Sequence, residues 1–344
     1  MQIPEQPDLP IHFLAACFNK TSATYKFYWF LAIVNQVERS KTTIAKRELF
    51  ADMIAHAWYT VNYFRVSFGK QDKLQHAINR VIQAEGLTID AERDTIFKQL
   101  AVTQDRDTLR ELNYFNAEVP HRFLSPWFPA AHMHQAYKAS QSYYNNCLYA
   151  LHRDHIDINP VWTKYLQQHA KILRNFCYWN LAVYLQAKNP NVPDIPNKLI
   201  KLPVRKALTE QRKFWDIVIA ELGGVDCIYT NSRLTVGNYA VEHFLPYAFV
   251  SHDLIWNLIP ADKSFNSSKS DRLPQLDKYF DAYFGLQQSA IEVITHKAPK
   301  NKCLEDYLTI VPNLDPAFFS AQRLRDQIEP LVTIARNNGF EYLI

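Results

Sequence analysis

The stretch VEHFLPYAFVSHDLIWNLIPADKSFNSSKSDRLP, residues 241–274, contains polar side chains that can do hydrolytic chemistry. Those that stand out are Glu242, His243, Asn257, Asn266 and Lys269. Glu242 and Asn266 offer oxygen ligands suited to Mg²⁺, which binds through few protein oxygens and keeps several waters. His243 can act as a general base because imidazole exchanges a proton near neutral pH. A base beside a hard metal ion suits the hydrolysis of a phosphodiester.

Cations before and after this stretch would attract a polyanion. From Lys198 to Lys213 the chain carries six cations and one acid, Glu210. The residues that we expect to contact phosphates are Lys206, Arg212, Lys213, Lys263 and Arg272. Such a run is also common on an ordinary solvated helix face, and that interpretation stays open.

The adjacency of Glu242 and His243 sets a geometric condition. Neighbouring residues in a regular strand point to opposite faces, so the chain must leave strand geometry here if both serve one site. Pro246 is compatible with such an exit. Taken alone, however, these residues fit a polar hairpin that runs into a capped helix at least as well as a catalytic site. His252 and Asp253 could contact a metal-bound water or DNA, but we interpret them as residues that structure the intervening loop.

The composition is that of a globular protein of one large or two domains. The chain has 344 residues, of which 48% are hydrophobic and 14% aromatic, which is ample for a core. The net charge of +4 permits an anionic partner without requiring one. Neither a G-x-G-x-x-G nor a P-loop pattern is present, so nothing indicates a nucleotide-binding loop.

Cysteine usage and hydropathy favour a cytoplasmic protein. The five cysteines are far apart and form no C-x-x-C pair, which disfavours a structural zinc site or a disulfide framework and fits reduced thiols. No run of 18 apolar residues is present, and the N-terminus does not resemble a signal peptide. We therefore expect no membrane span.

Hydrophobic periodicity predicts a helical N-terminal half. Helices are expected at about 23–40, 44–69, 73–85, 89–113, 129–152 and 159–188. The pairs His132/His134 and His152/His155 lack a convincing third metal ligand in the sequence. They are interpreted as surface or helix-end histidines.

The remainder of the chain changes character after residue 188. Four prolines between residues 189 and 203 exclude a continuous helix and mark a boundary. Beyond them, alternation over 226–246 predicts a short β-hairpin. Helices are expected on either side of this hairpin, at about 206–222, 266–279, 278–296 and 315–338.

The ordered polar residues resemble the signature of the HNH endonuclease family, the ββα-metal finger nucleases. That signature runs D-H-[I/F]-x-P, then N-L-x-P, then N-x-x-K. Here the corresponding stretches are Glu242-His243-Phe244-Leu245-Pro246, Asn257-Leu258-Ile259-Pro260 and Asn266-Ser267-Ser268-Lys269. The resemblance covers residues 227–272.

The resemblance implies a metal-dependent DNA endonuclease that hydrolyses phosphodiester bonds with a single Mg²⁺ or Mn²⁺. His243 would be the general base, and Glu242 and Asn266 would be the metal ligands. Asn257 would orient the histidine loop, and Lys269 would lie beside the phosphate. These three residues, His243, Asn257 and Lys269, form the expected catalytic set.

Two departures from the family pattern keep an alternative open. Glu242 stands where the family usually has aspartate, and Thr230 stands where a second knuckle cysteine would be. No structural zinc is therefore expected, and aromatic packing would have to hold the finger. The alternative function is a non-catalytic nucleic-acid-binding or assembly subunit that retains a degenerate HNH fold.

We therefore expect a mainly α chain that contains a small ββα-metal module. The expected parts are a helical domain for recognition or partner docking (1–188), a proline-rich connection (189–205), the HNH module (206–283) and C-terminal helices (284–344). DNA is the expected partner. Resemblance to restriction and anti-phage effectors implies a further partner, an ATPase or sensor protein of a defence system. A homo-oligomer is also expected, because two centres would allow both strands to be cut.

Overall fold

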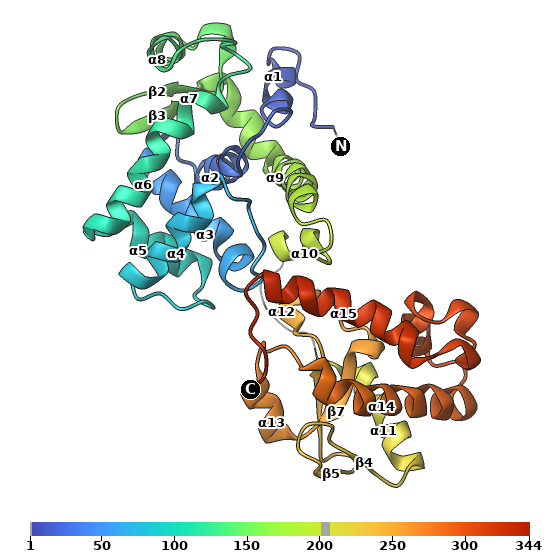
Figure 1. Cartoon of the computed structure of the whole chain (residues 1–344). Helices are drawn as coiled ribbons and strands as arrows, with labels where there is room; N and C mark the ends of the chain where they lie inside the picture. Colours follow the sequence, from blue (N-terminus) through green and yellow to red (C-terminus); the bar gives the residue numbers. More distant parts are fainter. Residues whose placement is uncertain (1, 201–206) are drawn as a thin grey trace. The chain divides into compact units, whose positions relative to one another are not determined.

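The structure is a computed structural model that describes residues 2–200 and 207–344. The chain divides into an N-terminal unit (Met1–Pro190 and Ile195–Pro203) and a C-terminal unit (Asn191–Asp194 and Val204–Ile344). Helices dominate the described part of both units, and the sheets there have only two or three strands (Figure 1). The expected mainly α fold is confirmed.

Ten α-helices are described in the N-terminal unit. They are α1 (Ile11–Ala16), α2 (Tyr25–Glu38), α3 (Lys46–Asn62), α4 (Lys73–Ala84), α5 (Arg93–Val102), α6 (Arg106–Glu118), α7 (Pro120–Phe123), α8 (Met133–Gln141), α9 (Pro160–Lys188) and α10 (Ile195–Ile200). Helix α2 packs against both α3 and α9, and it is buried almost all round because nearly every position from Phe27 to Val37 is apolar. Helix α9 begins where Asn159 caps the Val161 N–H and Pro160 occupies the first turn.

A three-stranded antiparallel sheet in this unit was not predicted. Strands β1 (Thr43–Ala45), β2 (Tyr149–Leu151) and β3 (His155–Ile158) lie in the order β1-β3-β2. The predicted helix over 129–152 is wrong beyond α8, because Tyr143, Asn145 and Asn146 adopt positive φ angles that a right-handed helix excludes.

Two other predicted helices are shorter than expected. The helix predicted over 44–69 ends at Asn62, well before Gly69, and begins after β1. The helix predicted over 89–113 is two helices, α5 and α6, because the Asp105 carboxylate accepts the Thr108 N–H and starts a new helix. The proline-rich stretch contains the short helix α10, and residues 201–206 lie outside the described part.

The C-terminal unit contains the stretch with the polar residues. Its elements are α11 (Thr209–Glu221), β4 (Val225–Asp226), β5 (Arg233–Leu234), β6 (Ala240–His243), α12 (Tyr247–Val250), β7 (Leu258–Ala261), α13 (Lys263–Lys269), α14 (Leu276–Lys297) and α15 (Ala321–Asn337). Strand β4 pairs with β5, and β6 pairs with β7. The region predicted as one hairpin, 226–246, therefore contributes to two separate two-stranded sheets.

Short 3-10 helices complete the description of both units. They are η1 (Tyr144–Asn146), η2 (Ile255–Asn257), η3 (Lys302–Thr309), η4 (Pro312–Leu314) and η5 (Pro316–Phe318). No helix among the described residues combines the length and apolar character that crossing a bilayer requires.

Helix α14 contacts the β6–β7 sheet and the residue that follows β6. It packs against α11 and β7, and the Tyr283 ring stacks on Phe244 with centroids 3.9 Å apart. The Gln287 amide donates to the Leu258 carbonyl at 2.9 Å. The expected boundary between the HNH module (206–283) and the C-terminal helices (284–344) falls inside α14. This helix runs without interruption across that boundary.

Candidate active site

Glu242 and His243 open onto one cavity although they are neighbours in a strand. In the β6–β7 ladder Glu242 pairs with Ile259 and His243 pairs with Leu258, the last pair of the ladder. A cavity of about 260 Å³ is lined by Glu242, His243, Pro246, Tyr247, Asn266, Ser267 and Ser270. Strand β6 ends at His243, so the chain leaves strand geometry where two neighbouring side chains are to serve one site.

Asn257 fastens the loop that follows His243. Its Oδ1 accepts the Leu245 N–H at 2.8 Å, and its Nδ2 donates to the Leu245 carbonyl at 3.0 Å. Its own backbone carbonyl accepts the Phe244 N–H at 2.8 Å. The side chain is fully buried, so these bonds hold the backbone beside His243 without contact with solvent.

His243 is paired with the carboxylate of Asp253. Its Nε2 lies 3.0 Å from Oδ1 of Asp253, and the His243 side chain is 5% exposed. A neutral imidazole that donates Nε2–H to Asp253 has Nδ1 as its proton acceptor. Asp253, interpreted from the sequence chiefly as a loop residue, therefore contacts the candidate base. The sequence did not predict this pair, because a spacing of ten residues across an irregular loop carries no periodic signal.

Lys269 and Glu242 form a buried ion pair. Lys269 Nζ lies 2.7 Å from Glu242 Oε1 and donates to the His243 carbonyl at 2.8 Å. The two side chains are 0% and 6% exposed. The ammonium is thus held against β6 by charge-assisted hydrogen bonds to the Glu242 carboxylate and the His243 carbonyl.

Helix α13 brings Asn266 and Lys269 to this strand. Asp262 caps the helix, since its Oδ1 accepts the Ser264 N–H at 2.9 Å and the Phe265 N–H at 3.0 Å. Asn266 and Lys269 are three residues apart and so lie on one side of a helix. Asn266 lines the cavity, whereas Lys269 is buried beneath it.

Hydrogen bonds and aromatic packing hold together the region where other family members have a zinc knuckle. Cys227 is buried; its carbonyl accepts the Asn231 N–H at 2.9 Å, and its Sγ accepts the Asp262 N–H at 3.4 Å. Tyr229 stacks on Phe265 with centroids 4.5 Å apart. Burial raises the pKa of the Tyr229 hydroxyl well above its usual range, so this ring stays neutral.

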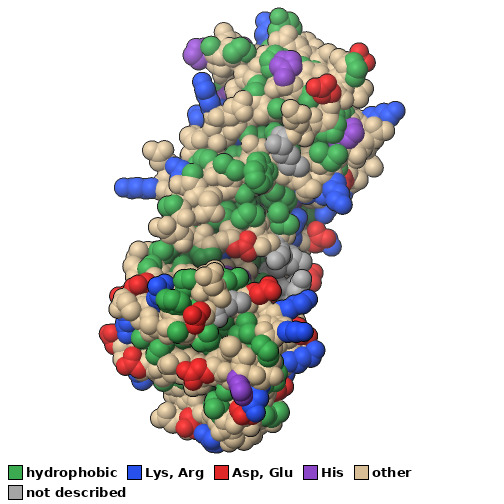
Figure 2. Space-filling view, turned by 90° about the vertical axis from the view of Figure 1, so that its right-hand side faces the viewer, with side chains coloured by type: hydrophobic (Ala, Val, Ile, Leu, Met, Phe, Trp, Pro, Cys, Tyr) green, Lys and Arg blue, Asp and Glu red, His purple; other side chains and the backbone are tan. Residues whose placement is uncertain are grey.

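The expected phosphate-contacting residues differ in how they are held. Arg212 donates to the Tyr239 carbonyl at 3.2 Å, and exposed Lys213 pairs with Glu210 at 2.8 Å. Lys263 is exposed and donates to the Gly237 carbonyl, and Arg272 is exposed. Lys206 lies outside the described residues. On the face drawn in Figure 2, basic side chains are interspersed with acidic ones.

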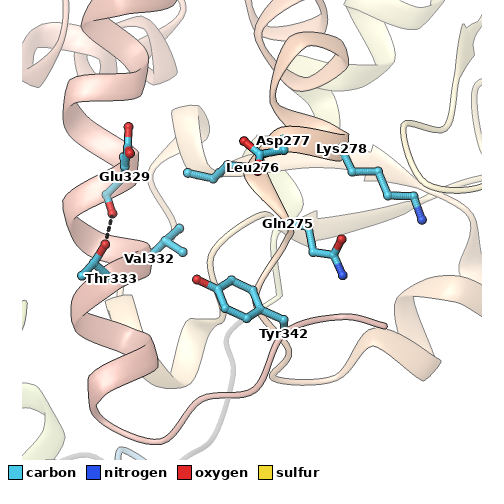
Figure 3. A pocket seen from close by; sticks show the side chains of 8 residues that line it. All are labelled: Gln275, Leu276, Asp277, Lys278, Glu329, Val332, Thr333 and Tyr342. Atoms are coloured by element: carbon cyan, nitrogen blue, oxygen red, sulfur yellow. Dashed lines mark hydrogen bonds between the residues drawn. The ribbon is translucent and has the colours of Figure 1, made fainter.

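A second, wider cavity of about 710 Å³ lies elsewhere in the C-terminal unit. The residues that line it are Gln275, Leu276, Asp277, Lys278, Glu329, Val332, Thr333 and Tyr342 (Figure 3). The Thr333 hydroxyl donates a hydrogen bond to the Glu329 carbonyl of the same helix at 3.0 Å. This cavity lacks a histidine among its lining residues, so the smaller cavity is the better candidate for hydrolysis.

Comparison with known proteins identifies the segment that carries the smaller cavity. Residues 227–275 match a family model described as HNH endonuclease. This segment is similar to HNH endonucleases, and we call it the HNH module. No curated protein and no solved structure matches the chain. The resemblance stated from the sequence is confirmed, and the HNH module indicates nuclease activity on a nucleic acid.

The matched segment coincides with the described site. It contains both strands of the β6–β7 sheet and α13, together with the Glu242–Lys269 and His243–Asp253 pairs. The HNH module therefore includes every residue that lines the smaller cavity. The N-terminal unit lies outside the matched segment.

Proposed function

We propose that the protein is a metal-dependent DNA endonuclease that hydrolyses phosphodiester bonds at the cavity of the HNH module. The observation that carries this proposal is the His243–Asp253 pair at 3.0 Å, on the wall of a cavity that also presents Glu242 and Asn266. A histidine oriented by a carboxylate, beside oxygen ligands, suits proton transfer from an attacking water.

In this mechanism His243 is the general base. Its Nδ1 accepts a proton from water, and the water oxygen forms a bond to phosphorus. The bond from phosphorus to the leaving oxygen breaks, which gives a phosphomonoester and a hydroxyl that takes its proton from solvent. Asp253 holds the imidazole through Nε2 and stabilises the imidazolium that forms. Asn257 keeps the backbone beside His243 in place.

The cavity fits a hard divalent ion such as Mg²⁺ or Mn²⁺. Glu242 supplies a carboxylate and Asn266 an amide oxygen, and a volume of about 260 Å³ leaves room for several waters around an ion. Glutamate in place of the usual aspartate is compatible with this arrangement because its longer arm reaches the cavity from β6. When bound, the ion stabilises negative charge on the phosphate and on the leaving oxygen.

Lys269 acts through Glu242 in this proposal. Its buried ammonium contacts the carboxylate at 2.7 Å, so it competes with a metal ion for that ligand and does not lie on the cavity wall. The same contact favours the second candidate function, a non-catalytic nucleic-acid-binding or assembly subunit. In that case the ammonium permanently takes the place that a metal ion has in an active nuclease.

A nicking assay separates the two candidates. Purified full-length protein is incubated with supercoiled plasmid and Mg²⁺ or Mn²⁺, and open circles are quantified on gels. We expect nicking by the wild type and a loss of roughly 10²–10⁴-fold in His243→Ala. His296→Ala, which changes an exposed histidine near the end of α14, should cut like the wild type. DNA binding without nicking in either metal would favour the second candidate.

The biological setting is proposed on family resemblance alone. The proposed protein is a cytoplasmic restriction or anti-phage effector that works beside an ATPase or sensor protein. A second copy of the chain would supply a second centre for the opposite strand. The identity of the neighbouring genes tests the defence role. Light scattering of the DNA complex tests whether two copies of the chain bind together.

A further inference from the structure

A tight hairpin in the N-terminal unit brings two histidines face to face. Strands β2 and β3 are joined by a two-residue turn, which the His152 N–H closes by donating to the His155 carbonyl at 3.0 Å. The two imidazole rings are stacked, with centroids 4.4 Å apart and planes 10° apart. Asp157 lies two residues further on the same, outward face of β3 (Figure 1 labels both strands).

Three ligand atoms converge on this face. His152 Nε2 lies 3.0 Å from Asp157 Oδ2, and His155 Nε2 lies 3.7 Å from the same oxygen. All three atoms lie within 4.8 Å of one another. A tetrahedral Zn²⁺ with bonds of about 2.0–2.1 Å holds neighbouring ligand atoms about 3.3 Å apart. The two distances to Asp157 lie on either side of that value, so these two pairs need only small side-chain movements to hold an ion.

The ligands are also oriented by outer hydrogen bonds. His155 Nδ1 lies 2.7 Å from the Asp154 carboxylate, which directs Nε2 toward Asp157. The Thr43 hydroxyl on β1 donates to the other oxygen of Asp157 at 2.6 Å. Histidines that bind a metal usually donate their second ring N–H to a carboxylate, and ligating carboxylates are themselves hydrogen-bonded. Both features are present here.

We infer that His152, His155 and Asp157 bind a divalent transition-metal ion of the Zn²⁺ type. Two imidazoles and one carboxylate suit Zn²⁺ better than Mg²⁺, which prefers oxygen ligands. The three side chains are each about one-third exposed, which leaves access for the ion and room for water as the fourth ligand. The ion would cross-link the turn of β2 and β3 and, through Thr43, tie it to β1.

This site is separate from the nuclease centre. It lies in the N-terminal unit, outside the matched HNH segment, and it uses nitrogen ligands where the HNH cavity offers oxygens for a hard ion. The sequence alone favours a surface role for His152 and His155, because spacing does not show that Asp157 shares a face with them. The alternation of β3 and its pairing with β2 bring that ligand into place.

Zinc titration of full-length protein tests the inference. Protein freed of metal by chelator and dialysis is titrated with Zn²⁺ alone by calorimetry. We expect the wild type to bind one equivalent more than His152→Ala/His155→Ala. His134→Ala, which removes an exposed histidine of α8, should match the wild type. Equal zinc stoichiometry in the double variant and the wild type would overturn the proposal.

A labelling measurement on the wild type does not depend on the folding of any variant. Diethyl pyrocarbonate modifies exposed imidazole nitrogens, and mass spectrometry reports each histidine separately. Zn²⁺ should protect His152 and His155 and leave His134 unchanged, whereas Mg²⁺ should protect none of the three. Labelling of His152 and His155 that is indifferent to Zn²⁺ would overturn the proposal, whether or not the protein cuts DNA.

Discussion

The ammonium of Lys269 lies 2.7 Å from Oε1 of Glu242, and both side chains are buried in the HNH module. An ion pair in this position joins the last residue of α13 to β6. It also places a cation against the carboxylate that the family pattern assigns to the metal. Stability and metal affinity therefore depend on the same contact, and each can be measured separately.

Removing the ammonium should destabilise the protein. Lys269→Met leaves the Glu242 carboxylate buried without its partner, which typically costs about 3–5 kcal/mol. The measurement is urea unfolding of the full chain. Lys297→Met is the matched control, because its pair with Glu221 is nearly half exposed and such pairs contribute about 0–1 kcal/mol. Equal losses in both variants would contradict a structural role for the buried pair.

The same substitution should strengthen metal binding in the HNH cavity. Without the ammonium, no protein cation at Lys269 competes with a metal ion for the Glu242 carboxylate. We expect Mn²⁺, followed by electron paramagnetic resonance, to bind Lys269→Met more tightly than wild type and Glu242→Gln more weakly. Mn²⁺ affinity that is unchanged in both variants would show that Glu242 is not a ligand.

Asp253 should affect turnover more than substrate binding. Asp253→Asn loses the charge that holds His243 and stabilises its protonated form, so kcat for nicking should fall while KM for DNA changes little. Asp253→Glu should recover part of the rate, since it restores the carboxylate. Asp277→Asn, at an exposed position in the first turn of α14, should have wild-type kinetics. A rise in KM alone would instead assign Asp253 to DNA contact.

Asn257 should contribute chiefly to stability. Asn257→Ala leaves the Leu245 N–H and carbonyl without their partner, at a cost of roughly 1–3 kcal/mol for each unsatisfied buried group. Asn257→Asp keeps the acceptor for the N–H but cannot donate to the carbonyl. Urea unfolding should show a clear loss in both variants. Full stability with lost nicking would mean that the amide acts on the substrate directly.

The exposed cations should set the salt dependence of DNA binding. Replacing Lys213, Lys263 and Arg272 together by glutamine should weaken binding and reduce the slope of log K against log salt by up to about 0.9 for each lost phosphate contact. Lys300→Gln, beyond the end of α14, is the control. Fluorescence anisotropy at several salt concentrations gives both slopes. An unchanged slope in the triple variant would show that these residues form an ordinary solvated surface and do not contact phosphates.

Elements governed by local rules could be predicted from the sequence. The predicted start of α9 agrees with the structure because Asn159 and Pro160 form a start signal that acts within one helical turn. The HNH pattern is recognisable because His243, Asn257 and Asn266 all lie within one short segment. Where the signal spans distant residues, as in the β1–β3 pairing of Thr43 with Asp157, periodicity predicted no strand.

By itself, the sequence determined the mainly α class and the order of the HNH residues, since helix periodicity and motif spacing are local properties of the chain. The tertiary structure decided which groups meet. It placed Asp253 on His243, turned Lys269 toward Glu242, and brought Asp157 to His152 and His155. These contacts depend on loop paths and strand register, which follow from the packing of the whole unit and not from the spacing between residues.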